Sequence, residues 1–382
     1  MKKHVTHIVC LILYAIALFV LNKGLDFTRP ADYPEGLDYA KAVVTNVIED
    51  EMGQDPDYSY IRIGKQTLEM RITSGEYKGK TIEVMNFVTR TNQTEGTVGT
   101  KYIVGSYDGY ITTNIMSYNR TNVVVILAIA FLAMVIIYGG SKGISAVLAL
   151  IVTLLNVIFL FMPMLINGVP AVIAAIIVVL ISTFHAMVAL NGFCAKSMIA
   201  TGCCTLCTAF AGILAWIVGE IAEITTLNTP EVEELLFITE RTHFRIDNLL
   251  IAGILIAAMG AVMDTSMSIV SSLYEIKMQS PFITAKELFK SGMNIGKDIM
   301  GTMTDTLILA FAGSSINLLV IYYMYQMPVI SLMNTDFFVV EVMKGLIGSM
   351  AVVLSIPVTA AITSAVIEKR KEKKCNIKSV AD

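Results

Sequence analysis

Two aspartates inside long apolar stretches are the residues of this sequence best suited to chemistry. Asp264 and Asp305 occupy the same place in two copies of the pattern Met-Gly-x-x-x-Asp-Thr, which begin at Met259 and Met300. A carboxylate within a membrane costs about 3 kcal/mol or more, so such residues usually face a bundle interior or a water-filled cavity. The two aspartates are therefore candidate ligands for a proton or a small cation.

The neighbours that the two patterns share extend this candidate site. Thr265 and Thr306 follow the aspartates, and each hydroxyl can hydrogen-bond the site or its own helix. Gly260 and Gly301 precede them by four residues, a spacing that places small residues on the same helix face. Because two neighbouring carboxylates cannot both ionise easily, such a pair suits a proton-carrying or cation-binding role.

A histidine and a cysteine cluster are weaker candidates for metal binding. His185 and the run Cys203-Cys204-x-x-Cys207 lie in apolar segments, and imidazole and thiolate are ligands of zinc. A single membrane histidine can equally hydrogen-bond a neighbouring helix, and buried cysteines can act as small packing residues. The sequence therefore leaves the metal undetermined and names no cofactor.

The elements that would carry these residues are membrane spans. The 382 residues are 55% hydrophobic and only 15% charged, whereas a soluble protein is about a quarter charged. A helix needs about 20 apolar residues to span a bilayer. The lipid bilayer is the expected partner, and the net charge of −3 gives no sign of nucleic acid. Eight spans are predicted, at His7–Leu21, Asn122–Tyr138, Gly143–Leu165, Pro170–Leu190, Ser197–Ile221, Asn248–Ser272, Ile299–Tyr325 and Phe337–Ile367.

Between the first two spans the sequence predicts a small all-β domain. Turn residues, including Gly64-Lys65, separate short β-branched runs, a pattern typical of an antiparallel barrel or sandwich. The domain contains no cysteine, so no disulfide framework supports it. Six strands are predicted, at Ala42–Ile48, Tyr58–Ile63, Thr67–Ile72, Thr81–Asn86, Lys101–Val104 and Tyr110–Ile115.

Charge asymmetry predicts the orientation in the membrane. Lysines fall at Lys142 and Lys196, between Lys277 and Lys297, and in the tail after Glu368, whereas the alternate short loops lack Lys and Arg. The positive-inside rule then places both termini in the cytoplasm and the β domain outside. We therefore divide the chain into an uncleaved signal anchor (1–23), an extracytoplasmic β domain (24–121), a seven-helix body (122–368) and a basic cytoplasmic tail (369–382).

In this topology the two aspartates lie at similar depth. At 1.5 Å per residue, Asp264 lies about 6 Å and Asp305 about 10 Å to the cytoplasmic side of the span midpoints. Their spans are antiparallel neighbours, and small residues recur around both aspartates. Since small residues let membrane helices approach closely, we expect each aspartate to lie in a packing face between helices.

The chain resembles the YibE/F-like membrane proteins of bacteria. The resemblance rests on Gly260-x-x-x-Asp264-Thr265-Ser266 and, more specifically, on Ile295-Gly296-x-Asp298-x-Met300-Gly301-Thr302-Met303-x-Asp305-Thr306. It also includes Gly75–Asn86 and Val98-Gly99-x-Lys101 in the β domain. It implies a single N-terminal span, an extracytoplasmic β domain and a multi-span body in the cell membrane, and adds Asp298 to the candidate site. It implies no particular activity.

A secondary transporter or permease for a small solute or cation is the function that the sequence favours. The paired acids and the short repeat on antiparallel spans resemble transporters, many of which bind substrate near the midplane of inverted repeats. Two alternatives stay open. The first is a non-transporting sensor or scaffold whose β domain binds a ligand or a partner. The second is an intramembrane aspartyl protease, although the protease pattern Gly-x-Gly-Asp is replaced here by Met303-Thr304-Asp305. Association with a partner membrane protein or with a second copy of the chain also stays open.

Overall fold

The computed structural model describes residue 14 and residues 16–18, 38–229 and 232–379. The chain forms two compact units, one of Arg29–Met134 and one of Met1–Thr28 with Val135–Asp382. Most of the predicted first span, His7–Leu21, and the last residues of the basic tail lie outside the described residues.

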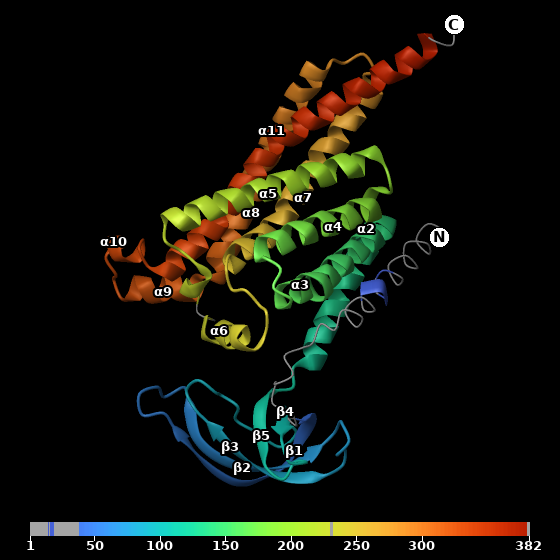
Figure 1. Ribbon diagram of the computed structural model, residues 1–382. Coiled ribbons are helices and arrows are strands. Elements are labelled where there is room, and N and C mark those ends of the chain that lie inside the picture. The colour runs from blue at the N-terminus through green and yellow to red at the C-terminus, as the bar shows by residue number, and fades with distance from the viewer. Residues whose placement is uncertain (1–13, 15, 19–37, 230–231, 380–382) are drawn as a thin grey trace. The chain divides into compact units, whose positions relative to one another are not determined.

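The first unit is built on one curled antiparallel sheet, a half-barrel (Figure 1). The strand order is β3-β2-β1-β4-β5, and the two edge strands β3 and β5 also approach each other. Alternate residues of β3 are buried and exposed, as expected for a strand with one face on a core. The strands are β1 (Asp38–Gln54), β2 (Arg62–Ile72), β3 (Thr81–Val88), β4 (Lys101–Ser106) and β5 (Thr113–Tyr118).

The sheet has five strands, so the prediction of six was wrong. The expected strands Tyr58–Ile63 and Thr67–Ile72 are replaced by the single strand β2, which runs through the predicted turn at Gly64. A Cβ at Gly64 would lie 2.4 Å from the carbonyl oxygen of Glu51 on β1. Glycine therefore allows the two strands to stay paired at a point where any side chain would separate them.

Buried polar side chains attach the segment after β3 to this sheet. The Gln66 amide donates to the Gly96 carbonyl (3.2 Å) and accepts from the Gly96 N–H (2.8 Å). The Asn86 amide and the Tyr102 hydroxyl both donate to the carbonyl of Thr94, at 2.6 and 2.8 Å. Because buried polar groups are costly unless paired, these bonds fix the segment over the core.

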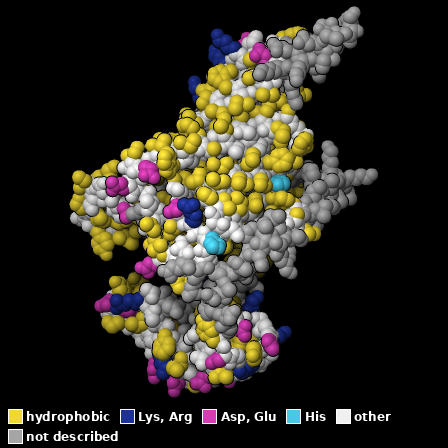
Figure 2. Space-filling model, in the orientation of Figure 1, with side chains coloured by type: hydrophobic (Ala, Val, Ile, Leu, Met, Phe, Trp, Pro, Cys, Tyr) yellow, Lys and Arg dark blue, Asp and Glu magenta, His cyan; other side chains and the backbone are white. Residues whose placement is uncertain are grey.

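The second unit is helical, and most of its long helices are apolar. Five helical segments of the described residues are long and apolar enough to span a membrane, and the pair α8 and α9 makes a sixth if the two count as one span. Figure 2 shows hydrophobic side chains over most of the visible helical surface. The helices are α2 (Thr121–Asn156), α3 (Met162–Ile166), α4 (Ala171–Asn191), α5 (Ala195–Ile221), α6 (Val232–Arg241), α7 (Leu249–Gln279), α8 (Ala285–Ser314), α9 (Ile316–Met324), α10 (Val329–Leu332) and α11 (Asp336–Ser379).

The described helices therefore provide five or six candidate spans where the sequence predicts eight. One source of the difference is α2, which joins two helices at Gly140, a residue with φ of 54°. This break falls between the predicted spans Asn122–Tyr138 and Gly143–Leu165. A Cβ at Gly143 would lie 2.2 Å from the Val135 carbonyl oxygen, so the chain can turn this sharply only with glycine there.

Two further irregularities interrupt the helices, and the second lies on the span that carries Asp305. A π-helix, η1 (Val157–Phe161), follows α2 directly. The predicted span Ile299–Tyr325 is broken at Ser315, where α8 and α9 meet at 64°. By contrast, α11 continues through Pro357.

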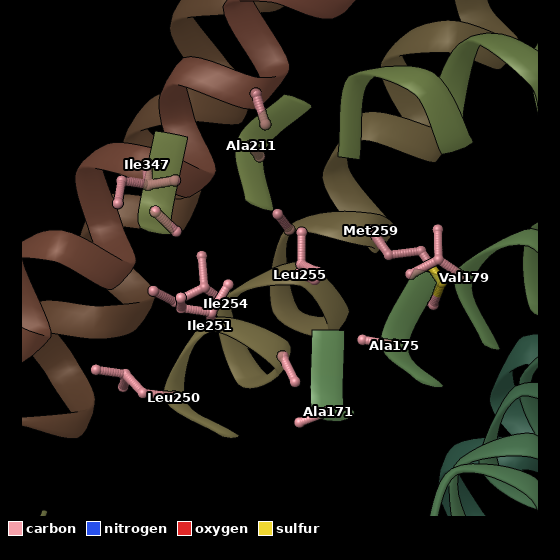
Figure 3. Close-up of a cluster of buried hydrophobic side chains, with 14 of the residues drawn as sticks. Ala171, Ala175, Val179, Ala211, Leu250, Ile251, Ile254, Leu255, Met259 and Ile347 are labelled. Atoms are coloured by element: carbon pink, nitrogen blue, oxygen red, sulfur yellow. The ribbon is translucent and has the colours of Figure 1, made fainter. Parts of the chain in front are cut away.

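The helical core lies where α5, α7 and α11 pack against one another and α4 packs on α5 and α7. Figure 3 shows part of this cluster, which includes Leu255 and Ile254 of α7, Ala211 of α5 and Ile347 of α11. Small side chains permit this close approach, since a Cβ at Gly212 would lie 3.0 Å from Leu255.

Candidate functional site

The two aspartates of the repeated motif lie on α7 and α8, and both side chains are exposed in the single chain. Asp298 lies seven residues before Asp305, and therefore on the same side of α8, and is also exposed. Within the described part of the chain, neither Asp264 nor Asp305 makes a hydrogen bond or an ion pair. Their carboxylate oxygens are available as acceptors.

The residues next to the aspartates do not cover the aspartate side chains. The Thr265 hydroxyl donates to the carbonyl of Ala261 (2.8 Å), and that of Thr306 donates to the carbonyl of Thr302 (2.7 Å). Each threonine is thus bonded to its own helix. A Cβ at Gly260 or at Gly301 would meet no atom within 4 Å.

We use the name aspartate face for two exposed surfaces together, the one around Gly260 and Asp264 on α7 and the one around Gly301 and Asp305 on α8. The small residues were expected to lie in packing faces between helices. Among the described residues of the chain, nothing packs against either glycine. The aspartate face is therefore uncovered in the single chain.

The candidate metal ligands do not come together. The Cys204 thiol lies 3.6 Å from the Thr183 hydroxyl and 3.9 Å from the carbonyl of Met259, contacts of a packed and hydrogen-bonded thiol. His185 Nδ1 lies 2.9 Å from the carbonyl of Ile181 on its own helix. Cys203 and Cys207 are buried. In the described residues no three His, Cys, Asp or Glu side chains are grouped as a metal site requires.

A buried polar network that the sequence reasoning missed joins three separate segments. The Tyr14 hydroxyl donates to Oδ1 of Asn156 (2.6 Å), and the Asn156 amide donates to the Ser182 hydroxyl (3.0 Å). The Tyr14 ring also lies 4.4 Å from the His185 ring, centroid to centroid. Asn156 and His185 are visible in the sequence as polar residues within spans, but nothing there pairs them with Tyr14.

A charged cavity of about 540 Å³ lies between the end of α5 and the start of α7. Its lining includes Glu220, Glu223, Arg245 and Asp247, and Nη2 of Arg245 lies 3.2 Å from Oδ2 of Asp247. That volume is typical of pockets for small molecules. Among the described residues that line it, three carboxylates outnumber the one cationic side chain, so this part of the lining favours cations.

The YibE/F-like protein family matches residues 127–369. The chain belongs to this family. The matched region contains Asp264, Asp298 and Asp305, together with the motifs around them. The Gly75–Asn86 motif of the β domain lies outside it. No curated protein and no solved structure matches the chain.

Family membership and the apolar helices make this YibE/F-like protein a multi-pass membrane protein. In the hydrocarbon core of a bilayer every backbone N–H and C=O must find a partner within the protein, and an α-helix pairs them within one segment. The lipid bilayer is therefore the solvent of the helical unit.

Proposed function

We propose that this YibE/F-like protein is a secondary transporter or permease for a small solute or cation, with Asp264 and Asp305 as its intramembrane carboxylates. One observation carries the proposal. Asp305 has no partner among the described residues, and it lies on a span that is broken by 64° at Ser315. Unpaired acids and discontinuous helices recur together in transporters, where they form the ion and substrate sites.

The chemistry of the aspartate face fits a proton or a cation. The hydroxyls of Thr265 and Thr306 are engaged with their own helices, so the carboxylates supply the free acceptors. Asp298 extends the row of acids along α8. Oxygen donors of this kind bind hard cations, and a carboxylate also carries a proton.

The charged cavity is the proposed entrance. Glu220, Glu223 and Asp247 would raise the local concentration of cations there. We place this cavity and the β domain on the extracytoplasmic side of the cell membrane, with eight spans and both termini in the cytoplasm, as the basic loops predict. In the bilayer, water, a second copy or a partner membrane protein must screen the aspartate face from lipid.

Reconstitution of the full chain into proteoliposomes tests the proposal. We expect proton or cation flux above that of empty liposomes, followed with a pH-sensitive dye and a panel of monovalent and divalent cations. Asp264→Asn and Asp305→Asn should each abolish the flux, and the double variant should be little worse than either. Asp38→Asn, an exposed change in β1, is the control. Wild-type flux in the double variant would overturn the assignment of the two aspartates, and no flux with any cation would overturn cation transport.

A sensor or scaffold is the second candidate, and one surface of the β domain favours it. Met85 and Phe87 on β3 are 59% and 60% exposed, and two large apolar side chains on one strand face form a suitable docking surface. Selective loss of a bound envelope component from a Met85→Ser, Phe87→Ser variant, with flux intact, would support it. The protease alternative loses support, because no hydrogen bond joins Asp264 to Asp305 among the described residues and a catalytic dyad shares a proton.

A further inference from the structure

The charged cavity between α5 and α7 has a lining that a simple inorganic ion would use only in part. Its volume of about 540 Å³ is enough for a small organic molecule. Carboxylates and apolar side chains both line it, and both kinds of surface are accessible inside the cavity. A metal ion would interact with the carboxylates alone, because hard cations take oxygen ligands. The apolar surface therefore bears on which ligand the cavity fits.

Two of the three carboxylates in the lining have no counter-ion. Arg245 is paired with Asp247, with Nη2 and Oδ2 3.2 Å apart. Glu220 and Glu223 are exposed, and neither makes a hydrogen bond or an ion pair within the described part of the chain. The cavity lies at the C-terminal end of α5 and the N-terminal end of α7, whose partial charges are opposite and offset each other. The uncompensated charge of the described lining is therefore negative and comes from Glu220 and Glu223.

The apolar surface of the charged cavity includes side chains that a ligand can reach. Trp216 and Leu227 line the cavity and are 51% and 54% exposed, and Ile246 of the lining is partly exposed. A ligand group placed against them leaves water, and each methylene that is buried in this way raises the affinity about fourfold. Tryptophan is also the side chain whose ring attracts cations most strongly. The lining thus suits a ligand that is charged at one end and apolar at the other.

We propose that the charged cavity binds an organic ammonium ion. The cationic group pairs with Glu220 and Glu223, and the apolar body contacts the side chains of Trp216, Leu227 and Ile246. This ligand class is that of the solute which enters the proposed transporter, so its role rests on the proposed function. Binding itself requires neither a gradient nor flux, and it is measured without them.

The single tryptophan of the chain provides the measurement. Trp216 lines the cavity and no other tryptophan occurs in the sequence, so fluorescence excited where tyrosine does not absorb reports on this cavity. The purified full chain in detergent is titrated at neutral pH with three probes. The first, 2-phenylethylamine, is an ammonium ion with an apolar body. Methylamine has the charge without the body, and 2-phenylethanol has the body without the charge.

We expect a saturable change in Trp216 fluorescence with 2-phenylethylamine. Methylamine should bind at least about tenfold more weakly, because the burial of two methylene groups is already worth that much. The neutral alcohol should bind severalfold more weakly, since ion pairs to exposed carboxylates contribute modestly.

Two double variants with the same loss of charge form the matched pair. Glu220→Gln, Glu223→Gln should bind 2-phenylethylamine severalfold more weakly and should no longer prefer it to 2-phenylethanol. Glu233→Gln, Glu234→Gln removes two exposed carboxylates of α6 that are not in the described lining, so this variant should bind as the wild type does.

Three results would overturn the inference: no saturable change, equal affinity for 2-phenylethylamine and methylamine, or an unchanged preference over 2-phenylethanol in Glu220→Gln, Glu223→Gln. The result is separable from that of the flux assay. Binding of 2-phenylethylamine by a chain that shows no flux would contradict transport alone. Flux in a chain that does not bind it would contradict the ammonium site alone.

Discussion

The Tyr14 hydroxyl donates a 2.6 Å hydrogen bond to Oδ1 of Asn156, 142 residues later in the chain. Asn156 is fully buried, and its amide donates a second hydrogen bond to the hydroxyl of Ser182 on α4. It is also the residue directly before the π-helix η1. The bond therefore joins Tyr14 to a point where the helical backbone is irregular. π-Helical turns of this kind are frequent at functional sites.

Tyr14→Phe is predicted to destabilise the helical unit. The change leaves the Asn156 oxygen buried without its donor, which should cost about 1–3 kcal/mol. The measurement is thermal unfolding of the purified protein in detergent, with Tyr138→Phe as the control because Tyr138 is 89% exposed. Equal unfolding temperatures for the two variants would contradict the prediction.

Two glycines of the family motif should respond oppositely to alanine. A Cβ at Gly296 would lie 2.1 Å from Cγ2 of Ile356, which is buried on α11, so Gly296→Ala should overpack the interface and cost about 1–3 kcal/mol. At Gly301 nothing lies within 4 Å, and Gly301→Ala should be neutral or stabilise α8 by up to about 1 kcal/mol. Unfolding temperatures of the two variants test this. A stable Gly296→Ala protein would mean that α8 and α11 are not packed in this way.

The β domain should lose stability at acid pH. Backbone hydrogen bonds from Thr112 and the Ser106 hydroxyl lower the pKa of Asp108 to about 2, and the hydrogen bond from Arg90 lowers the pKa of Asp55. Since both pKa values lie below those of the unfolded chain, near 3.9, this stability is present above about pH 4 and is lost as the pH falls toward 2.

Denaturant unfolding of the isolated residues 38–120 between pH 6 and pH 2 measures this loss. Asp108→Asn removes the titrating group while it keeps the side-chain shape, so the variant should show a flatter dependence on pH below 4. An identical dependence in the variant and the wild type would show that Asp108 does not contribute.

The orientation is tested by cysteine labelling in intact cells. A cysteine introduced at Glu83, an exposed position of β3, should react with a membrane-impermeant thiol reagent. The native Cys375 in the basic tail should react only after the cells are opened. Labelling of Cys375 from outside would reverse the predicted topology.

The sequence by itself determined the apolar segments, the β domain and the family. Hydrophobic runs separated by charged loops suffice for this, because burial in lipid and alternation on a sheet leave patterns in the order of residues. It also identified Asp264 and Asp305 as unusual, since a charge in an apolar run is visible without a structure. The prediction of six strands was wrong at Gly64, because a glycine in a turn and a glycine required by close strand pairing look the same in sequence.

Only the tertiary structure decided what surrounds these residues. No proline lies at the 64° break at Ser315, so the sequence does not indicate it. The hydrogen bond between Tyr14 and Asn156 joins residues 142 positions apart. The packing faces expected around Gly260 and Gly301 are uncovered in the single chain, whereas Gly296 is tightly enclosed. The physical reason is that periodicity gives the side of a helix on which a residue lies, but the neighbour on that side depends on how all the helices pack.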